Sequence, residues 1–298
     1  MTPLSTELFR CGVIALIGRP NVGKSTLLNA LLGQKLSITS RKPQTTRHCL
    51  RGVLTARTTQ FIFVDTPGFQ SRHRGALNRI MNRAVRGTLE SVDVSALVVE
   101  AARFGAEDRA VLKLAPAGTP LVLVVNKIDV SDRERLLPFL KRIESEAEFA
   151  EIVPVSARRR KGLDELLRSL ERHLPEQPAI HHEHDLTDRN ERFFAAELIR
   201  EKLFRSLGEE LPYSSGVEIE KFEEQGALRS IQASIVVEKE GHKAIVIGTG
   251  GEKLKEIATA ARLDMEKLFG GKVYLQVWVR VRRGWTNDEA AVRKLGYG

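Results

Sequence analysis

Residues 18–25, Gly-Arg-Pro-Asn-Val-Gly-Lys-Ser, have the types and the spacing that bind phosphate groups. They follow the apolar run 13–17 and precede a helical pattern at 26–32. Glycines let consecutive N–H groups point inward, and a helix start adds positive potential, so the run predicts a cradle for phosphate oxygens. Lys24 is expected to neutralise the β- and γ-phosphates of a nucleotide, and the Ser25 hydroxyl to bind Mg²⁺. The predicted cradle comprises Gly18, Arg19, Pro20, Asn21, Val22, Gly23, Lys24, Ser25 and Thr26.

A second candidate element follows the apolar run 61–64 and comprises Asp65, Thr66, Pro67 and Gly68. An acidic side chain at the tip of a strand can hold the metal ion through water, and the N–H of Gly68 can meet the γ-phosphate. A Pro-Gly turn after a strand is common by chance, so its position downstream of the phosphate loop carries the prediction.

The polar segment 41–48 lies between these two elements and contains Thr45 and Thr46. A threonine hydroxyl there would complete the Mg²⁺ shell only when the γ-phosphate is present, which is the behaviour of a switch. We favour Thr46, and one sequence does not decide between the two. The residues expected to act in hydrolysis are Lys24, Thr46 and Gly68, and those expected to hold the metal ion are Ser25, Thr46 and Asp65.

The choice of base is predicted from Asn126, Lys127 and Asp129, which follow the apolar run 121–125. The Asp129 carboxylate can accept hydrogen bonds from the guanine N1–H and amine, whereas adenine offers an acceptor at N1 and no amine at C2. A polar site left unpaired rejects the wrong base, so GTP and GDP are the expected ligands, and ATP is disfavoured. Lys127 can cover the base, and Asn126 can tie this loop to the phosphate loop. A later loop with Ser156, Ala157 and Arg158 is expected to offer a backbone N–H to guanine O6.

Phe69 stands where Ras-like enzymes have the glutamine that orients the attacking water. Intrinsic hydrolysis is therefore expected to be slow. The water could be positioned by Gln70, by the backbone of the switches, or by a monovalent cation such as K⁺, for which Asn21 is a candidate ligand.

The elements that must position these residues alternate between strands and helices from residue 12 to about 174. Runs 13–17, 60–64, 96–99, 121–125 and 152–155 are typical of strands, and 77–89, 108–114 and 163–173 have helical periodicity. The strands are continuously apolar, as expected when helices cover both faces. The fold class is therefore α/β, with a doubly wound, mostly parallel sheet.

A second, smaller α+β domain is predicted after a linker. We assign residues 1–175 to the nucleotide-binding domain, 176–189 to the linker and 190–298 to the second domain and its tail. The three linker histidines at 181, 182 and 184 lack further ligands in sequence and are interpreted as solvated. In the second domain a helix at 190–207, strands at 217–222 and 230–237, helices at 244–247 and 252–269, and a strand at 273–281 follow one another.

Residues 248–251, Gly-Thr-Gly-Gly, lie between the last two helices. A lone G-x-x-G is more often a capping turn, but in this order of elements it resembles the loop of a type II KH domain, which binds single-stranded RNA. The predicted RNA contacts, from this loop and from neighbouring basic residues, are Lys243, Gly248, Thr249, Gly250, Gly251, Lys253, Arg280, Arg282 and Arg283. Arg280 and Arg282 are expected to share one strand face.

The net charge of +9 is unevenly distributed along the 298 residues. Residues 1–175 hold 28 Lys/Arg against 17 Asp/Glu, 176–240 hold 8 against 15, and 241–298 hold 11 against 6. Such a local excess of basic residues suits an anionic partner, although basic runs are usually solvated faces.

Two cysteines, Cys11 and Cys49, are too few for a disulfide scaffold or a zinc site, and a cytoplasmic location fits. No run is long enough to span a membrane, and no heptad pattern suggests a dimer, so a monomer is expected.

These motifs, together with Leu211-Pro212-Tyr213, resemble the bacterial Era family of GTPases along almost the whole chain. The resemblance implies a GTPase that acts in assembly of the small (30S) ribosomal subunit. It also implies that the KH domain grips the 3′ end of 16S rRNA under control of the nucleotide, and that the protein associates peripherally with the inner membrane.

Two other functions compete with this one. A regulatory GTPase could use its second domain to bind protein partners, and the acidic segment 176–240 favours that alternative. An ATP-driven RNA remodeller is disfavoured, because adenine cannot satisfy the carboxylate of Asp129.

Overall fold

The structure is a computed structural model that describes residues 9–40, 42, 45–69, 75–208 and 211–297. Two compact units make up the chain, each with its own sheet. Of the described residues, the first unit takes 9–37, 46–69 and 82–188, and the second takes 38–40, 42, 45, 75–81, 189–208 and 211–297. No helix in the described ranges is long and apolar enough to cross a membrane.

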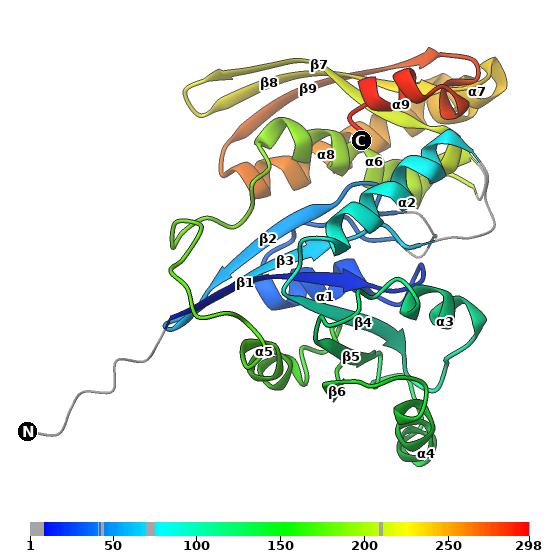
Figure 1. Ribbon diagram of the computed structural model, residues 1–298. Coiled ribbons are helices and arrows are strands. Elements are labelled where there is room, and N and C mark those ends of the chain that lie inside the picture. Colours follow the sequence, from blue (N-terminus) through cyan, green and yellow to red (C-terminus); the bar gives the residue numbers. More distant parts are fainter. Residues whose placement is uncertain (1–8, 41, 43–44, 70–74, 209–210, 298) are drawn as a thin grey trace, which may run out of the picture. The chain divides into compact units, whose positions relative to one another are not determined.

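A six-stranded sheet forms the centre of the first unit (Figure 1). Its strands are β1 (Arg10–Ile17), β2 (Leu50–Thr55), β3 (Thr59–Asp65), β4 (Val94–Glu100), β5 (Leu121–Asn126) and β6 (Glu151–Pro154), in the order β2-β3-β1-β4-β5-β6. All neighbours are parallel except β2 and β3. The predicted doubly wound, mostly parallel α/β class is confirmed. Strand β2 was not predicted, because Arg51 and Gly52 interrupt its apolar run at the sheet edge.

Five helices accompany this sheet, α1 (Lys24–Leu32), α2 (Ala76–Leu89), α3 (Ala106–Leu112), α4 (Arg133–Glu144) and α5 (Leu163–Glu171). Val85, Val111 and Phe139, from α2, α3 and α4, pack in one core with strand residues such as Leu97 and Leu123. Helix α1 lies against β2 and β3, and α5 lies against β5 and β6. Helix α4 was not predicted. Its sequence has apolar residues at helical spacing, which pack against the core at Leu136, Phe139, Leu140 and Ile143, but Pro138 in its interior disfavours a helix.

The carboxyl ends of β1, β3 and β5 carry the three candidate motifs. The sheet order reverses at β1, whose neighbours β3 and β4 lie on opposite sides, and ligands of α/β sheets bind at such a reversal. Gly18 is required at this crossing, because a Cβ there would lie 2.4 Å from the Val98 carbonyl oxygen of β4. The topology therefore gathers motifs that are distant in the sequence.

The second unit contains a three-stranded sheet with helices α6 and α8 along one face (Figure 1). Its elements are α6 (Glu191–Ser206), β7 (Gly216–Gln225), β8 (Leu228–Val237), α7 (Glu240–Ile247), α8 (Glu252–Phe269) and β9 (Lys272–Val281). Strand β8 pairs antiparallel with β7 and parallel with β9. Ile199, Ile231, Ile257 and Val279 lie in its core. The predicted small α+β domain is confirmed, in the predicted order of elements.

The end of the chain, which had no assignment from sequence, folds onto the second unit. A 3₁₀ turn (Trp285–Asn287) and α9 (Glu289–Lys294) pack with Val236 of β8. Trp285 is fully buried, and its ring lies 6.3 Å from that of Tyr297. The tail is therefore part of the fold of this unit.

Residues 176–188, within the predicted linker, belong to the first unit and are held against its sheet by Gln60 of β3. The Gln60 carboxamide oxygen accepts the N–H groups of Ile180 and His181, each at 2.9 Å, and its nitrogen donates to the His181 carbonyl. Further along, Val53 of β2 donates its N–H to the Leu186 carbonyl. Because Gln60 is fully buried, no surface pattern in the sequence marks it as the anchor of this segment.

Candidate nucleotide and RNA sites

The phosphate loop joins β1 to α1 and encloses the ammonium of Lys24. The Lys24 Nζ donates to the carbonyl oxygens of Gly18 at 2.8 Å and Arg19 at 3.1 Å. Asn21 and Gly23 both have positive φ, so the loop turns sharply before α1 begins. Thr26 is half-buried in the first turn of α1. This is the strand, loop and helix start that a phosphate cradle needs.

Burial lowers the pKa of Lys24 to about 8, while nearby Asp65 opposes that shift and Arg19 adds to it. At neutral pH the side chain of Lys24 therefore remains a cation. A bound phosphate would stabilise this cation better than the nucleotide-free site does. A lowered pKa is a feature of functional sites, and the place of Lys24 in the phosphate loop assigns it to binding.

Asp65, Ser25 and Thr46 converge at the end of β3. The Ser25 hydroxyl donates to Asp65 Oδ2 at 2.7 Å and lies 2.8 Å from the Thr46 hydroxyl. Thr45 instead donates its hydroxyl to the Lys42 carbonyl at 2.7 Å. The geometry thus brings Thr46, the favoured candidate, to the predicted metal residues. Ser37, which sequence reasoning missed, also donates to Asp65 Oδ2, at 2.8 Å, and no spacing rule would have found it.

A Mg²⁺ ion fits this cluster. Asp65 is fully buried, its Oδ1 has no hydrogen-bond partner, and burial raises the pKa of its carboxyl. A cation placed there would satisfy the unpartnered oxygen and favour the ionised carboxylate. Hydroxyl and carboxylate oxygens are the ligands that Mg²⁺ prefers.

The turn after Asp65 lies close to the phosphate loop. A Cβ on Gly68 would lie 2.9 Å from the backbone of Pro20, so only glycine fits there. Thr66 is fully buried and donates its hydroxyl to the Leu16 carbonyl, while Pro67 is also buried. Phe69 packs against the core of the first unit. Gln70 lies outside the described residues.

Asn126 links three loops on the base side of the site. Its amide nitrogen donates to the Val22 carbonyl at 2.9 Å, and its oxygen accepts the Ala157 N–H at 3.1 Å. The Ser156 N–H donates to the Lys161 carbonyl. Guanine O6, expected from sequence to meet this loop, must therefore compete with Asn126 for the Ala157 N–H.

Asp129 is oriented by a neighbour. The Ser156 hydroxyl donates to its Oδ1 at 2.5 Å and accepts the Arg159 N–H at 3.1 Å. A carboxylate fixed in this way can recognise the paired N–H donors of guanine. The Arg158 side chain, also predicted at the base, is exposed.

An ion network connects the phosphate loop to the base loop. The buried Arg19 guanidinium donates to Asp108 at 3.1 Å and to Glu100 at 2.9 Å, and Glu100 lies 3.2 Å from the Lys127 ammonium. The Arg19 side chain is therefore structural, although its carbonyl holds Lys24. Glu100 was missed, although an acidic residue at the end of the apolar strand β4 is a recognisable signal.

The Gly-Thr-Gly-Gly loop of the second unit joins α7 to α8. Gly248, Gly250 and Gly251 all have positive φ, with values of 72°, 60° and 83°. Gly248 also packs so closely that a Cβ would lie 2.6 Å from that of Lys253. The loop ends at the start of the 18-residue α8, where free N–H groups and the helix dipole favour phosphate.

The basic residues predicted to bind RNA lie on α7, on α8, on β9 and directly after β9. Lys243 and Lys253 are half-buried in α7 and α8, which flank the loop. Arg280 lies on β9 between Val279 and Val281, which contribute to the core, so its side chain points to the opposite face, where it pairs with Glu220. Strand β9 ends at residue 281, and the Arg282 N–H still donates to the Val237 carbonyl of β8 at 2.8 Å, so the strand face shared by Arg280 and Arg282 stays a prediction. Arg282 and Arg283, which follow it, are exposed.

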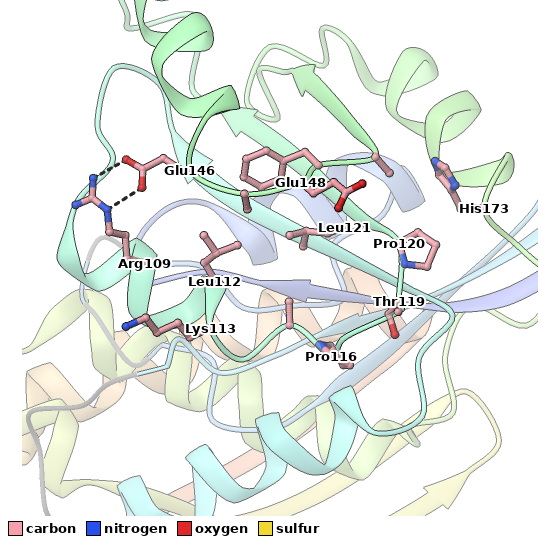
Figure 2. A pocket seen from close by; sticks show the side chains of 15 residues that line it. Arg109, Leu112, Lys113, Pro116, Thr119, Pro120, Leu121, Glu146, Glu148 and His173 are labelled. Carbon is pink, nitrogen blue, oxygen red and sulfur yellow. Dashed lines mark hydrogen bonds and ion pairs between the residues drawn. The ribbon is translucent and has the colours of Figure 1, made fainter.

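A cavity of about 810 Å³ lies elsewhere on the first unit (Figure 2). It is lined by residues that include Leu121, at the amino end of β5, and His173, with the Arg109–Glu146 ion pair at one side. Asn126 ends the same strand at its carboxyl end. The predicted nucleotide residues that the structure describes do not line this cavity, which is therefore separate from their site.

The affinity for GTP is expected to fall as the pH rises above about 8. Bound phosphates raise the pKa of Lys24 above its nucleotide-free value of about 8, so the complex retains a proton that the free protein loses. Affinity is then full below pH 8 and falls by up to about tenfold per pH unit above it. Titration with a fluorescent GTP analogue from pH 7 to 9 measures this. A Lys24→Arg variant stays charged and should give a flat profile, and a wild-type profile equally flat would contradict the assignment.

Comparison with known proteins places the two units in known families. Residues 13–127 match the family model described as 50S ribosome-binding GTPase, and residues 210–286 match that of the KH domain. The GTPase Era of Nitrosomonas eutropha is 54% identical over 295 residues, which are 99% of this chain and 100% of that protein. The GTPase Era of Chromobacterium violaceum is 55% identical over 289 residues, which are 97% and 98% of the two chains.

Two crystal structures are similar to the whole chain. An Aquifex aeolicus Era variant bound to GDP·AlF4⁻ superposes with a TM-score of 0.94 at 37% identity, over 97% of this chain and 100% of that one. Era in complex with MgGDPNP and nucleotides 1506–1542 of 16S ribosomal RNA superposes with a TM-score of 0.93 at 36% identity, over 97% and 99%. These similar proteins therefore bind guanine nucleotides, one of them with Mg²⁺ and an rRNA fragment.

Proposed function

The chain belongs to the Era family of GTPases, and we propose that this GTP-hydrolysing enzyme binds the 3′ end of 16S rRNA and acts in assembly of the 30S ribosomal subunit. The proposal assigns RNA binding to the second unit and control of that binding to the nucleotide. The observation that carries it is the loop of three positive-φ glycines at the start of α8, in a chain 36% identical to an Era that was crystallised with this RNA.

The residues of the first unit have separable tasks in hydrolysis. Lys24 supplies positive charge to the transferring phosphoryl group, and the N–H of Gly68 meets the γ-phosphate beside Pro20. Ser25, Thr46 and Asp65 would hold Mg²⁺, which would offset the negative charge of the phosphates. Asp129 orients the base and thereby the phosphate chain. Phe69, which is apolar and packed in the core, cannot orient water, and this supports a slow intrinsic rate.

Replacing Gly250 by aspartate is expected to weaken RNA binding at least about tenfold, a loss of about 1.4 kcal/mol. The substitution adds a negative charge to a loop that would lie against phosphate, while aspartate tolerates the positive φ of 60°. Binding of a 3′-terminal 16S rRNA oligonucleotide, measured with GDP and with a non-hydrolysable GTP analogue, tests this. Tighter binding with the analogue is expected for the wild type.

A matched control is available in the same unit. Gly226, in the turn between β7 and β8, has a φ of 62° and open space around it, as Gly250 has. A Gly226→Asp variant makes the same chemical change away from the loop and should bind RNA normally. Equal RNA binding by the Gly250→Asp variant would argue against the proposal. Retention of protein partners without RNA would favour the alternative regulatory GTPase.

Potassium is proposed to assist hydrolysis through Asn21. Asn21 is exposed at a positive φ in the phosphate loop, and the chain lacks the glutamine of Ras-like enzymes. An Asn21→Ala variant is expected to lose roughly tenfold in hydrolysis rate in potassium buffer, about 1.4 kcal/mol of barrier, with little change in sodium buffer. An unchanged rate in potassium would exclude the cation role.

A cytoplasmic monomer with peripheral contact to the inner membrane completes the proposal. The buried Cys11 and the half-buried Cys49 are not joined in a disulfide bond, which suits a reducing compartment. Membrane contact is supported only by the resemblance to the family.

A further inference from the structure

A basic turn follows the base-binding loop of the first unit. Arg158, Arg159, Arg160 and Lys161 are consecutive, and all four side chains are exposed. We call residues 157–161 the arginine turn. Nucleotide binding, as described above, uses at most its first arginine, so the remaining three charges have no task in hydrolysis.

The backbone of the arginine turn is held in one shape. Ser156 and Lys161 form an antiparallel bridge with hydrogen bonds of 3.0 and 3.1 Å, and the Arg160 N–H lies 3.4 Å from the Ala157 carbonyl oxygen. Arg160 has a positive φ of 55°, and Gly162 follows at 74°, where a Cβ would lie 2.5 Å from the Pro154 carbonyl. A turn fixed in this way presents its side chains without the entropy cost of ordering a loop.

The charges of the arginine turn lack the acidic partners that other arginines of this unit have. Arg109 forms a two-point ion pair with Glu146, and Arg172 forms one with Glu151. Within the described part of the chain, no ion pair is recorded for the four basic residues of the turn. Asp164 and Glu165, the nearest acidic residues in sequence, are exposed in the first turn of α5. An external anion would therefore relieve the mutual repulsion of these charges.

The chemistry of the turn favours a nucleic-acid backbone as that anion. A guanidinium binds phosphate through two parallel hydrogen bonds, and three consecutive arginines offer several such forks. A membrane-binding surface normally adds apolar side chains that enter the lipid. The only apolar residue of the turn, Ala157, is buried.

We propose that the arginine turn binds the phosphate backbone of ribosomal RNA, so that the GTPase unit contacts the small ribosomal subunit independently of the KH unit. This inference rests on the proposed rRNA binding and extends it to a second surface. The contact is independent of base sequence, because it is made to phosphates.

The test removes three charges and keeps the fold of the turn. The variant is Arg159→Ser/Arg160→Asn/Lys161→Ser. Asparagine tolerates the positive φ at position 160. The backbone N–H of residue 159, which donates to the Ser156 hydroxyl, is unchanged by the substitution. Arg158 is unchanged because it is assigned to the nucleotide site. The control Arg57→Ser/Lys113→Ser/Lys141→Ser removes the same charge from exposed positions of the same unit.

Binding to purified 30S subunits is measured over a range of salt concentrations, with a non-hydrolysable GTP analogue present. The turn variant is expected to bind at least about tenfold more weakly at low salt, and the slope of log K against log salt should shrink by about 2 for three lost phosphate contacts. GDP affinity and binding of the 3′-terminal oligonucleotide should equal those of the wild type. The control variant should bind subunits normally.

Each other outcome has a definite meaning. Equal subunit binding by wild type and turn variant overturns the inference, as does an equal loss in the control, which would indicate general electrostatic attraction. Loss of binding to anionic phospholipid vesicles with normal subunit binding would assign the turn to a membrane and overturn it as well. If the wild type fails to bind the oligonucleotide, the KH proposal fails, and the subunit measurement still decides the role of the turn.

Discussion

An Asp129→Asn variant is expected to lose about 100-fold or more in affinity for GDP and to prefer xanthosine diphosphate. Asp129 can accept two N–H donors of guanine, and each hydrogen bond to a charged group contributes about 1.5–3 kcal/mol. Asparagine presents an NH₂ group to the guanine amine, so two donors would face each other. Xanthine has a carbonyl at that position and can accept from the asparagine.

The structure makes this substitution a sharp test. The Ser156 hydroxyl, 2.5 Å from Asp129 Oδ1, can also bond to an asparagine oxygen, so the side chain should keep its orientation. Competition between the two nucleotides, measured by fluorescence, gives the change in preference.

The neighbouring Asp132 provides the matched control. It caps α4 by accepting the Glu134 N–H, and asparagine caps helices about as well as aspartate. An Asp132→Asn variant therefore makes the same change of charge three residues away and should bind GDP normally. Retained guanine preference in the Asp129→Asn variant would show that another group selects the base.

A Lys24→Ala variant is expected to lose roughly 1,000-fold or more in kcat/KM for GTP hydrolysis, about 4 kcal/mol of transition-state stabilisation. The charge of the transferring phosphoryl group spreads over its oxygens, and Lys24 is a buried cation of the phosphate loop. Arg19, which is also buried in this loop, is instead paired with the Glu100 and Asp108 carboxylates. Single-turnover hydrolysis with saturating Mg²⁺ measures the loss.

The same substitution should not unfold the protein. Burial lowers the pKa of Lys24 from 10.5 to about 8, so the charged side chain costs about 3 kcal/mol in the nucleotide-free chain. The removal of this buried charge stabilises the nucleotide-free protein and offsets the destabilisation caused by the loss of methylene packing. The melting temperature without nucleotide should therefore stay level or rise. Exposed Lys113, changed to alanine, is the control and should leave the hydrolysis rate unchanged. A Lys24→Ala enzyme within tenfold of the wild type would refute the assigned role.

The family, the α/β class and the GTPase activity could all be predicted from the sequence. The residues that touch phosphate and base lie in short contiguous runs, 18–25, 65–68 and 126–129, each directly after an apolar strand. The chemistry of each run depends on the spacing of residues within one short segment. This spacing can be read from the sequence without knowledge of the fold. The order of elements around Gly248 made the KH domain recognisable in the same way.

Contacts between distant segments were decided only by the tertiary structure. The contact of Thr46 with Asp65, the hydrogen bond from Ser37 to Asp65, and the hydrogen bonds of Gln60 with residues 180 and 181 all join residues at least 19 positions apart. Sequence patterns report which residues neighbour one another along a helix or strand, whereas these contacts depend on how strands are ordered in a sheet and on which buried polar atoms must find partners.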